Sequence, residues 1–132
     1  MTKALKITFQ AAFYLYLAAI AVLCFGNFSS LPSVSNTILG IPTDKVVHFV
    51  MFFPFPILAF LAYDKFTGTV KSAIIFAVVT FLAGCIIAAA TEIGQAYLTD
   101  YRSGDPTDFL ADILALLLGS CIATWIDLKT LK

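Results

Sequence analysis

Charged residues are scarce in this sequence. They make up 12% of its 132 residues, whereas hydrophobic residues make up 61%. A soluble domain of this length buries about two-thirds of its unfolded surface, so a mean hydropathy of +0.97 would leave many apolar side chains facing water. The composition therefore argues against an ordinary soluble fold and indicates an integral membrane protein, with one domain over residues 1–132.

Several signals of chemistry are also missing. The Lys and Arg residues form no cluster of the kind that binds nucleic acid. The sequence has no HExxH, P-loop or GxSxG motif and no acid-phosphatase-type set of Arg and His. We therefore expect no nucleic-acid partner, no metal and no cofactor, and we favour a protein that is not an enzyme. The three cysteines lie in apolar runs without metal-type spacing, which is typical of small core or lipid-facing residues: Cys24, Cys85 and Cys121.

Four hydrophobic runs approach the length of about 20 residues that a helix needs to cross a bilayer core. The second run contains Pro54 and Pro56, which predict a kink because proline lacks an amide hydrogen and its ring clashes with the preceding turn. The first run is longer than a signal-peptide core, so we expect a retained helix. The fold class is therefore all-α, a four-transmembrane-helix bundle. The runs cover residues 7–28, 46–63, 72–98 and 109–125.

The connections between the runs predict the orientation in the membrane. The polar stretch 29–43, with its Pro and Gly residues, is typical of a loop. Two basic residues, Lys45 and Arg102, lie in the connections after the first and third runs. The other six lie at the termini and in the connection between the second and third runs. Because cytoplasmic segments carry an excess of Lys and Arg, both termini are predicted to be cytoplasmic. These six are Lys3, Lys6, Lys65, Lys71, Lys129 and Lys132.

Polar residues gather at the predicted outer end of three spans. Lys71 and Glu92 are separated by 21 residues, a helical rise of about 30 Å, which puts Glu92 near the outer interface. In each of the three spans a second polar residue follows the first by three or four positions, so both can share one helix face. We therefore expect the pairs at similar depth. They are Asp44 with His48, Glu92 with Gln95, and Asp108 with Asp112.

Helix capping is a plainer explanation for some of these residues. Asp44 would favour a helix N-terminus electrostatically, and Thr43 could cap it. In the next case Asp105 fits the N-cap position and Pro106 the first helical position. Asp108 then fits the reciprocal position of a capping box. Both capping and ligand binding therefore explain Asp108.

The residues at membrane depth are harder to explain by capping. His48 could simply be a buried histidine satisfied by a carboxylate. Ionisable groups such as Glu92 and Asp112 cost about 2.5–3.5 kcal/mol at membrane depth and usually face a cavity or a partner. Arg102 is the best-placed partner for them, since its planar guanidinium group can bind a carboxylate or a ligand phosphate.

The motifs in this order resemble the VanZ-like family, from about residue 44 to residue 119. Asp112 stands where the family usually has Asn, and Ala115 where it often has Gly. The resemblance implies a multi-pass protein of the bacterial cell envelope, in the inner (cytoplasmic) membrane, and a possible role in resistance to the glycopeptide teicoplanin. The motifs are DKVVHF at 44–49, EIGQ at 92–95, Arg102, Asp108 and Gly119.

We favour the hypothesis that the outer end binds membrane lipids, such as a lipid-linked envelope precursor or another anionic headgroup. The cations would contact the ligand, and the carboxylates would position the cations or accept hydrogen bonds from the ligand. The oligomeric state is left open. The candidate ligand-binding residues are Asp44, Lys45, His48, Glu92, Gln95, Arg102, Asp108 and Asp112.

Three alternatives stay open from the sequence. An intramembrane enzyme could use His48 as a general acid or base, with Glu92 or Asp44 as its partner. A proton or ion pathway is suggested by the carboxylates, although the inner halves of the spans lack the charges of a relay. A purely structural cluster, in which Arg102 neutralises Glu92, would hold the helices together.

Overall fold

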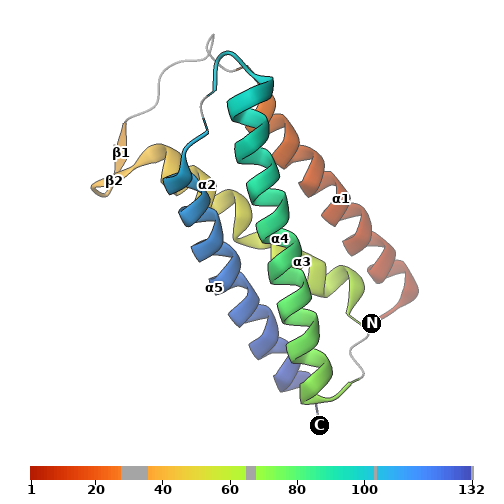
Figure 1. Cartoon of the computed structure of the whole chain (residues 1–132). Helices are drawn as coiled ribbons and strands as arrows, with labels where there is room; N and C mark the ends of the chain where they lie inside the picture. Colours follow the sequence, from red (N-terminus) through yellow and green to blue (C-terminus); the bar gives the residue numbers. More distant parts are fainter. Residues whose placement is uncertain (28–35, 65–67, 103, 132) are drawn as a thin grey trace.

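The computed structural model describes residues 1–27, 36–64, 68–102 and 104–131 as a bundle of helices with a small hairpin at one side (Figure 1). Four helical segments are long and apolar enough to cross a membrane, and α2 with α3 forms the second of them. The predicted all-α membrane bundle is thereby confirmed. The elements are α1 (Lys3–Phe25), β1 (Thr37–Ile38), β2 (Ile41–Pro42), α2 (Thr43–Phe52), α3 (Pro54–Tyr63), α4 (Val70–Leu98) and α5 (Pro106–Thr130).

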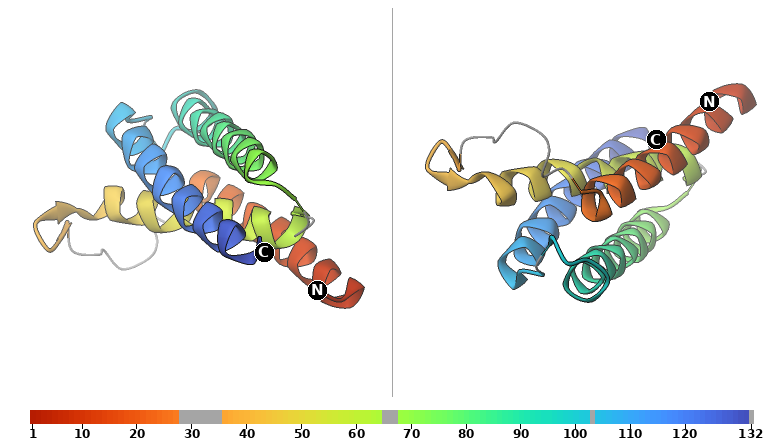
Figure 2. Two further views of the ribbon diagram at one scale, coloured as in Figure 1. Left: turned by 90° about the horizontal axis from the view of Figure 1, so that it is seen from below. Right: turned by 90° about the horizontal axis from the view of Figure 1, so that it is seen from above.

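The two termini lie at the same end of the bundle (Figure 1). This arrangement is the one expected of four spans, although the side of the membrane stays a prediction. Helix α3 packs against both α1 and α5, and α4 packs along α5 (Figure 2). The first span was predicted to reach Phe28, which lies outside the described residues, and α1 ends at Phe25 with Gly26 as its C-cap.

Local sequence signals explain most of the helix starts. The Thr69 hydroxyl accepts a hydrogen bond from the Ser72 amide at 3.2 Å, and the Ser72 hydroxyl accepts one from the Thr69 amide at 2.9 Å, which forms a capping box for α4. The Asp105 carboxylate accepts a bond from the Thr107 amide at 2.9 Å, and Pro106 is the first residue of α5. The predicted N-cap of α5 is therefore confirmed.

The start of α2 differs from the expectation that Thr43 caps it. Thr43 is the first helical residue, and the N-cap position is held by Pro42, which makes no side-chain capping bond. The Thr43 amide instead donates to the Asn36 carbonyl at 3.0 Å. A backbone carbonyl just before β1 therefore satisfies one of the helix-start amides that have no partner within the helix.

The described part of the predicted loop 29–43 contains this hairpin; residues 29–35 lie outside the description. Strands β1 and β2 are antiparallel, with Thr37 opposite Pro42 and Ile38 opposite Ile41. Leu39 and Gly40 form the turn with φ values of 52° and 80°, the positive pair that a two-residue hairpin turn requires.

The predicted kink is present between α2 and α3, at Phe53. Pro54 and Pro56 cannot donate to carbonyls in the preceding turn, so the hydrogen-bond ladder is interrupted there. A Cβ atom added to Gly119 of α5 would lie 2.5 Å from the Phe53 carbonyl oxygen. Gly119 therefore allows α5 to approach the kink closely.

Small residues recur every four positions along α5, at Ala111, Ala115, Gly119 and Ala123. At Gly119 this row of small residues faces the kinked second span. On α4, Gly84 allows the close approach of α5, because a Cβ atom there would lie 2.5 Å from the Leu116 side chain. Leu116 and Ala115 are fully buried, while Leu114 remains 61% exposed on the outer surface of the bundle. Exposed apolar side chains of this kind are expected of a lipid-facing surface.

Candidate functional site

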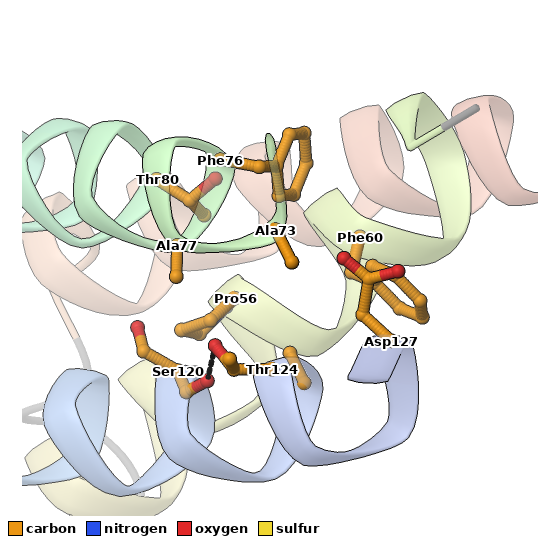
Figure 3. Close-up of a pocket in the computed structure, with 10 residues that line it drawn as sticks. Pro56, Phe60, Ala73, Phe76, Ala77, Thr80, Ser120, Thr124 and Asp127 are labelled. Atoms are coloured by element: carbon orange, nitrogen blue, oxygen red, sulfur yellow. Dashed lines mark hydrogen bonds between the residues drawn. The ribbon is translucent and has the colours of Figure 1, made fainter. Parts of the chain in front are cut away.

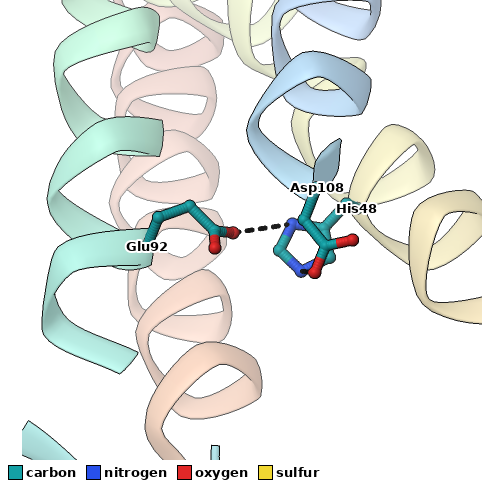
Figure 4. A group of neighbouring side chains, drawn as sticks. All are labelled: His48, Glu92 and Asp108. Carbon is teal, nitrogen blue, oxygen red and sulfur yellow. Dashed lines mark ion pairs between the residues drawn. The ribbon is translucent and has the colours of Figure 1, made fainter. Parts of the chain in front are cut away.

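The candidate site lies at the end of the bundle away from both termini, where α2, α4 and α5 meet. It brings together His48 from α2, Glu92 from α4, and Asp108 and Asp112 from α5. All four side chains are buried, and Asp112 is completely so. Figure 4 shows the Glu92 carboxylate reaching from α4 toward the His48 ring. The three spans therefore converge as predicted. Helix α2 contributes His48, α4 contributes Glu92, and α5 contributes both Asp108 and Asp112.

His48 is surrounded by three carboxylates. Its Nδ1 atom lies 2.9 Å from Asp112 Oδ1 and 3.5 Å from Glu92 Oε1, and its Nε2 atom lies 3.6 Å from Asp108 Oδ2. With Asp112 ionised, its carboxylate only accepts hydrogen bonds, and in that state Nδ1 carries the hydrogen and donates it. The sequence named Glu92 or Asp44 as the partner of His48, whereas the shortest contact is with Asp112.

Lys45 contacts Asp108 as well and joins two further carboxylates, Asp44 and Asp105, to the same network. Its Nζ atom lies 2.7 Å from Asp108, 3.1 Å from Asp44 and 3.2 Å from Asp105. From the sequence Asp105 was interpreted mainly as an N-cap, and the structure adds its ion pair with Lys45. The useful signal was the spacing of Asp105 and Asp108, which puts two carboxylates in the first turn of one helix. Asp108 thereby bridges Lys45 and His48.

Asp105 lies outside the membrane-spanning helices and performs two tasks. Its carboxylate accepts hydrogen bonds from the hydroxyl and the amide of Thr107 at 2.7 and 2.9 Å. These bonds, together with Lys45, lower the pKa of Asp105 to about 2. The group is therefore an anion at any pH near neutrality, both as a cap and as a partner of Lys45.

Two buried carboxylates each keep one oxygen without a hydrogen-bond partner among the described residues. Glu92 Oε2 accepts a bond from the Asp105 amide at 3.0 Å, whereas Glu92 Oε1 has no such partner. Asp112 Oδ1 is bound to His48, whereas Asp112 Oδ2 has none. Buried polar atoms are usually satisfied, so these oxygens indicate a place where another group can bind.

Gln95 and Arg102 face the C-terminal end of α1. The Gln95 amide donates to the Cys24 carbonyl at 2.9 Å, and the Arg102 guanidinium donates to the Leu23 and Gly26 carbonyls at 3.2 and 3.4 Å. Carbonyls of a final helical turn lack partners within the helix, and these side chains supply them. The predicted pairing of Arg102 with Glu92 stays a prediction.

A cavity of about 590 Å³ separates these two groups of residues. Asp44, His48, Gln95, Arg102 and Asp108 all lie on its wall, so five predicted ligand-binding residues share one space. Three other predicted residues contact this network without lining the cavity, namely Lys45, Glu92 and Asp112. Among the described residues, the lining consists of Leu23, Cys24, Thr43, Asp44, Val47, His48, Met51, Gln95, Tyr101, Arg102 and Asp108.

The site also contains donors of the types that hold metal ions. One donor atom each from His48, Glu92 and Asp108 lies within 4.8 Å of the others. Asp44, Asp105 and Asp108 form a second such group, and Lys45 Nζ already contacts all three carboxylates. The first group combines an imidazole with two carboxylates, a set that can bind a divalent ion or exchange a proton.

A much smaller pocket lies near the terminal end, between α3, α4 and α5. Its volume is about 10 Å³, and its lining includes Pro56, Phe60, Ser120 and Asp127 (Figure 3). The Ser120 hydroxyl is buried without a hydrogen-bond partner in the described structure. This volume suits about one water molecule, so the pocket is too small for a headgroup or substrate.

A family model described as VanZ/LLP1 matches residues 13–127 of the chain. The match includes all eight predicted ligand-binding residues and all four candidate spans, at least in part. Neither a search of curated proteins nor a search of solved structures gives a significant match.

Proposed function

Because the chain belongs to the VanZ/LLP1 family and has four membrane-spanning helices, we propose that it binds a lipid headgroup at its outer end. The occupant is an anionic lipid or lipid-linked envelope precursor. The observation that carries this proposal is the cavity of about 590 Å³ lined by Arg102, His48 and Asp108. Sites for small ligands commonly have volumes of about 300–1,000 Å³.

The cavity wall combines charges of both signs. Arg102 on one side can bind a phosphate through its planar guanidinium group. Asp44 and Asp108 on the other side can accept hydrogen bonds from hydroxyl or amino groups. A headgroup that carries a phosphate together with such donors would satisfy both sides. A simple hydrocarbon or a fully cationic ligand would offer no negatively charged group to the Arg102 guanidinium.

The apolar part of the wall supports a lipid rather than a free metabolite. Leu23, Val47 and Met51 line the same cavity as the polar residues. Leu23 and Val47 are also 47% and 48% exposed, on the surface of helices that cross the membrane. A headgroup in the cavity could thus keep its acyl chains in the surrounding bilayer, where they need no protein pocket.

Native mass spectrometry of the detergent-purified protein tests the proposal. We expect an anionic or lipid-linked species to remain bound to the unmodified protein and to be lost from the Arg102→Ala variant. The matched control is Lys71→Ala, which removes one exposed cation at the start of α4, at the other end of the bundle. Equal and unspecific lipid in all three proteins would contradict headgroup binding.

A second candidate function is an intramembrane enzyme that acts on a lipid headgroup. The observation in its favour is the 2.9 Å contact of His48 with the buried Asp112, because a carboxylate that orients an imidazole is typical of a general base. Purified protein incubated with extracted membrane lipids should then release headgroup products, and His48→Gln should abolish this release. Lipid that stays intact would exclude this candidate.

A role in teicoplanin resistance is proposed from the family resemblance alone. Expression of the chain in a susceptible bacterium should raise the teicoplanin concentration that inhibits growth. Arg102→Ala should remove the effect if it depends on headgroup binding, whereas Lys71→Ala should keep it. Unchanged susceptibility with confirmed membrane insertion would argue against this role.

A further inference from the structure

We propose that His48, Glu92 and Asp108 bind one divalent transition-metal ion, such as Zn²⁺ or Mn²⁺. From the sequence no metal is expected, because it has no metal-binding motif such as HExxH and its cysteines lack metal-type spacing. These three donors are far apart in the sequence, so only the packing of α2, α4 and α5 brings them together (Figure 4).

One pair of donors already has the spacing of a coordination site. His48 Nε2 and Asp108 Oδ2 are 3.6 Å apart, whereas Glu92 Oε1 lies 3.5 Å from the other ring nitrogen, Nδ1. Ligand atoms at about 2.1 Å from a common ion lie about 3 to 4 Å from one another. All three donors are within 4.8 Å, so modest side-chain rotations suffice to bring them onto one ion.

Each proposed ligand is held by a second contact. The Asp105 amide binds Glu92 Oε2, Lys45 binds Asp108 Oδ1, and Asp112 binds His48 Nδ1. These contacts leave Glu92 Oε1, Asp108 Oδ2 and His48 Nε2 for an ion. Metal ligands are commonly oriented by such outer contacts, which also fix the tautomer of a ligating histidine.

Glu92 supplies an independent observation in favour of an ion. The residue is only 8% exposed, and its Oε1 atom has no hydrogen-bond partner. The same atom points toward the His48 ring (Figure 4). An unsatisfied carboxylate oxygen at membrane depth is costly, and coordination of a cation would remove that cost.

The charge of the whole network also favours a cation. Among the described residues, the ion pairs of this network join five carboxylates with Lys45 and with His48, which is a cation only when it is protonated. If every carboxylate is ionised, five negative charges stand against one or two positive charges, so these groups together carry at least three net negative charges. A bound divalent ion would reduce this excess. The carboxylates are Asp44, Glu92, Asp105, Asp108 and Asp112.

The donor set indicates the class of ion. Imidazole nitrogen suits Zn²⁺ and other transition metals, whereas Mg²⁺ and Ca²⁺ prefer an all-oxygen shell. Because His48 and Asp108 line the large cavity, an ion between them would be accessible from it. The ion could then also contact the phosphate of a headgroup. This last step rests on the proposed function, whereas ion binding itself does not.

Metal titration of the purified protein tests the site. The detergent-solubilised protein is treated with a chelator, dialysed and titrated with Zn²⁺ by calorimetry, with the bound metal measured by mass spectrometry. We expect about one ion per chain and an affinity that falls at least about tenfold in Glu92→Gln. Asp127→Asn is the matched control, because Asp127 is also buried, near the other end of α5, and should bind Zn²⁺ unchanged.

A second measurement uses the unmodified protein, so it does not depend on the folding of a variant. His48 is the sole histidine of the sequence, and a ¹⁵N-histidine label therefore reports on this ring alone. Zn²⁺ should shift the resonance of one ring nitrogen at about one equivalent, and Mg²⁺ should not. Absence of both the shift and stoichiometric binding would overturn the metal site, and binding unchanged by Glu92→Gln would too. Lipid retention, measured separately, decides the headgroup proposal.

Discussion

The His48 ring donates from Nδ1 to the Asp112 carboxylate across a distance of 2.9 Å, which joins α2 to α5 inside the membrane. Asp112 is fully buried and His48 is 7% exposed, so neither group can exchange this contact freely for water. The VanZ-like family, which the sequence resembles, usually has Asn at the position of Asp112. An Asn side-chain oxygen could also accept from Nδ1.

Substitution of Asp112 should therefore depend on whether an acceptor remains. Asp112→Asn should keep the Nδ1–H tautomer of His48, because the amide oxygen replaces the carboxylate oxygen. Asp112→Leu should remove the acceptor, mix the tautomers and lower the stability by about 1–3 kcal/mol. The measurements are ¹⁵N NMR of the single histidine and thermal unfolding in detergent. Identical spectra for the two variants would contradict this role of Asp112.

The charge of Asp105 should stabilise the protein in a defined pH range. The Thr107 bonds and Lys45 lower the pKa of Asp105 to about 2, below its ordinary value of about 4. Stability from this carboxylate is thus fully present above about pH 4 and is lost as the pH falls toward 2. Asp105→Asn keeps an N-cap side chain but removes the charge.

The melting temperature of Asp105→Asn should accordingly fall below that of the unmodified protein from pH 5 to pH 7. The difference should disappear as the pH approaches about 2, because the native carboxyl group is then becoming protonated as well. Thermal unfolding in detergent at several pH values measures it. Asp100→Asn, at an exposed position before Arg102, is the control and should leave the melting temperature unchanged. A difference that grows as the pH falls would contradict the assignment.

Enlargement of Gly119 should destabilise the kinked second span. A Cβ atom there would lie 2.5 Å from the Phe53 carbonyl oxygen and 3.1 Å from Pro56. Gly119→Ala gains about 1 kcal/mol of helix propensity. The added methyl group should nevertheless cause a net loss of about 1–3 kcal/mol, because backbone atoms must move. Circular dichroism on heating measures the effect, with Cys121→Leu as an exposed control on the same helix. An increase in stability would show that the contact relaxes easily.

The membrane orientation can be tested with single cysteines in a protein whose native cysteines are replaced by alanine. A membrane-impermeant maleimide added to intact cells should label a cysteine at Asp100 and should not label one at Thr2 or Leu131. The physical reason is that six of the eight basic residues belong, in the sequence, to the two termini and to the connection between the second and third spans. The opposite labelling pattern would reverse the orientation. The native cysteines are Cys24, Cys85 and Cys121.

Local chemistry in the sequence determined much of the fold. The hydrophobic runs predict four spans because a bilayer core requires about 20 apolar residues per helix. Pro54 and Pro56 predict the interruption at Phe53, and Asp105 with Pro106 predicts the start of α5. Each of these signals acts within a few residues of the chain. Glu92 was identified for a similar reason, because an ionisable group at membrane depth needs a buried partner or a cavity.

Only the tertiary structure decided which of these polar residues contact one another. Asp112 is the nearest carboxylate to His48, and Asp105 joins Lys45 across a sequence separation of 60 residues. Gln95, one turn from Glu92, donates to α1 instead of the His48 network. The physical reason is that helical spacing defines which residues share a face but not how helices are rotated against one another. That rotation depends on close packing, such as the approach of Gly119 to the kink, and no local pattern contains it.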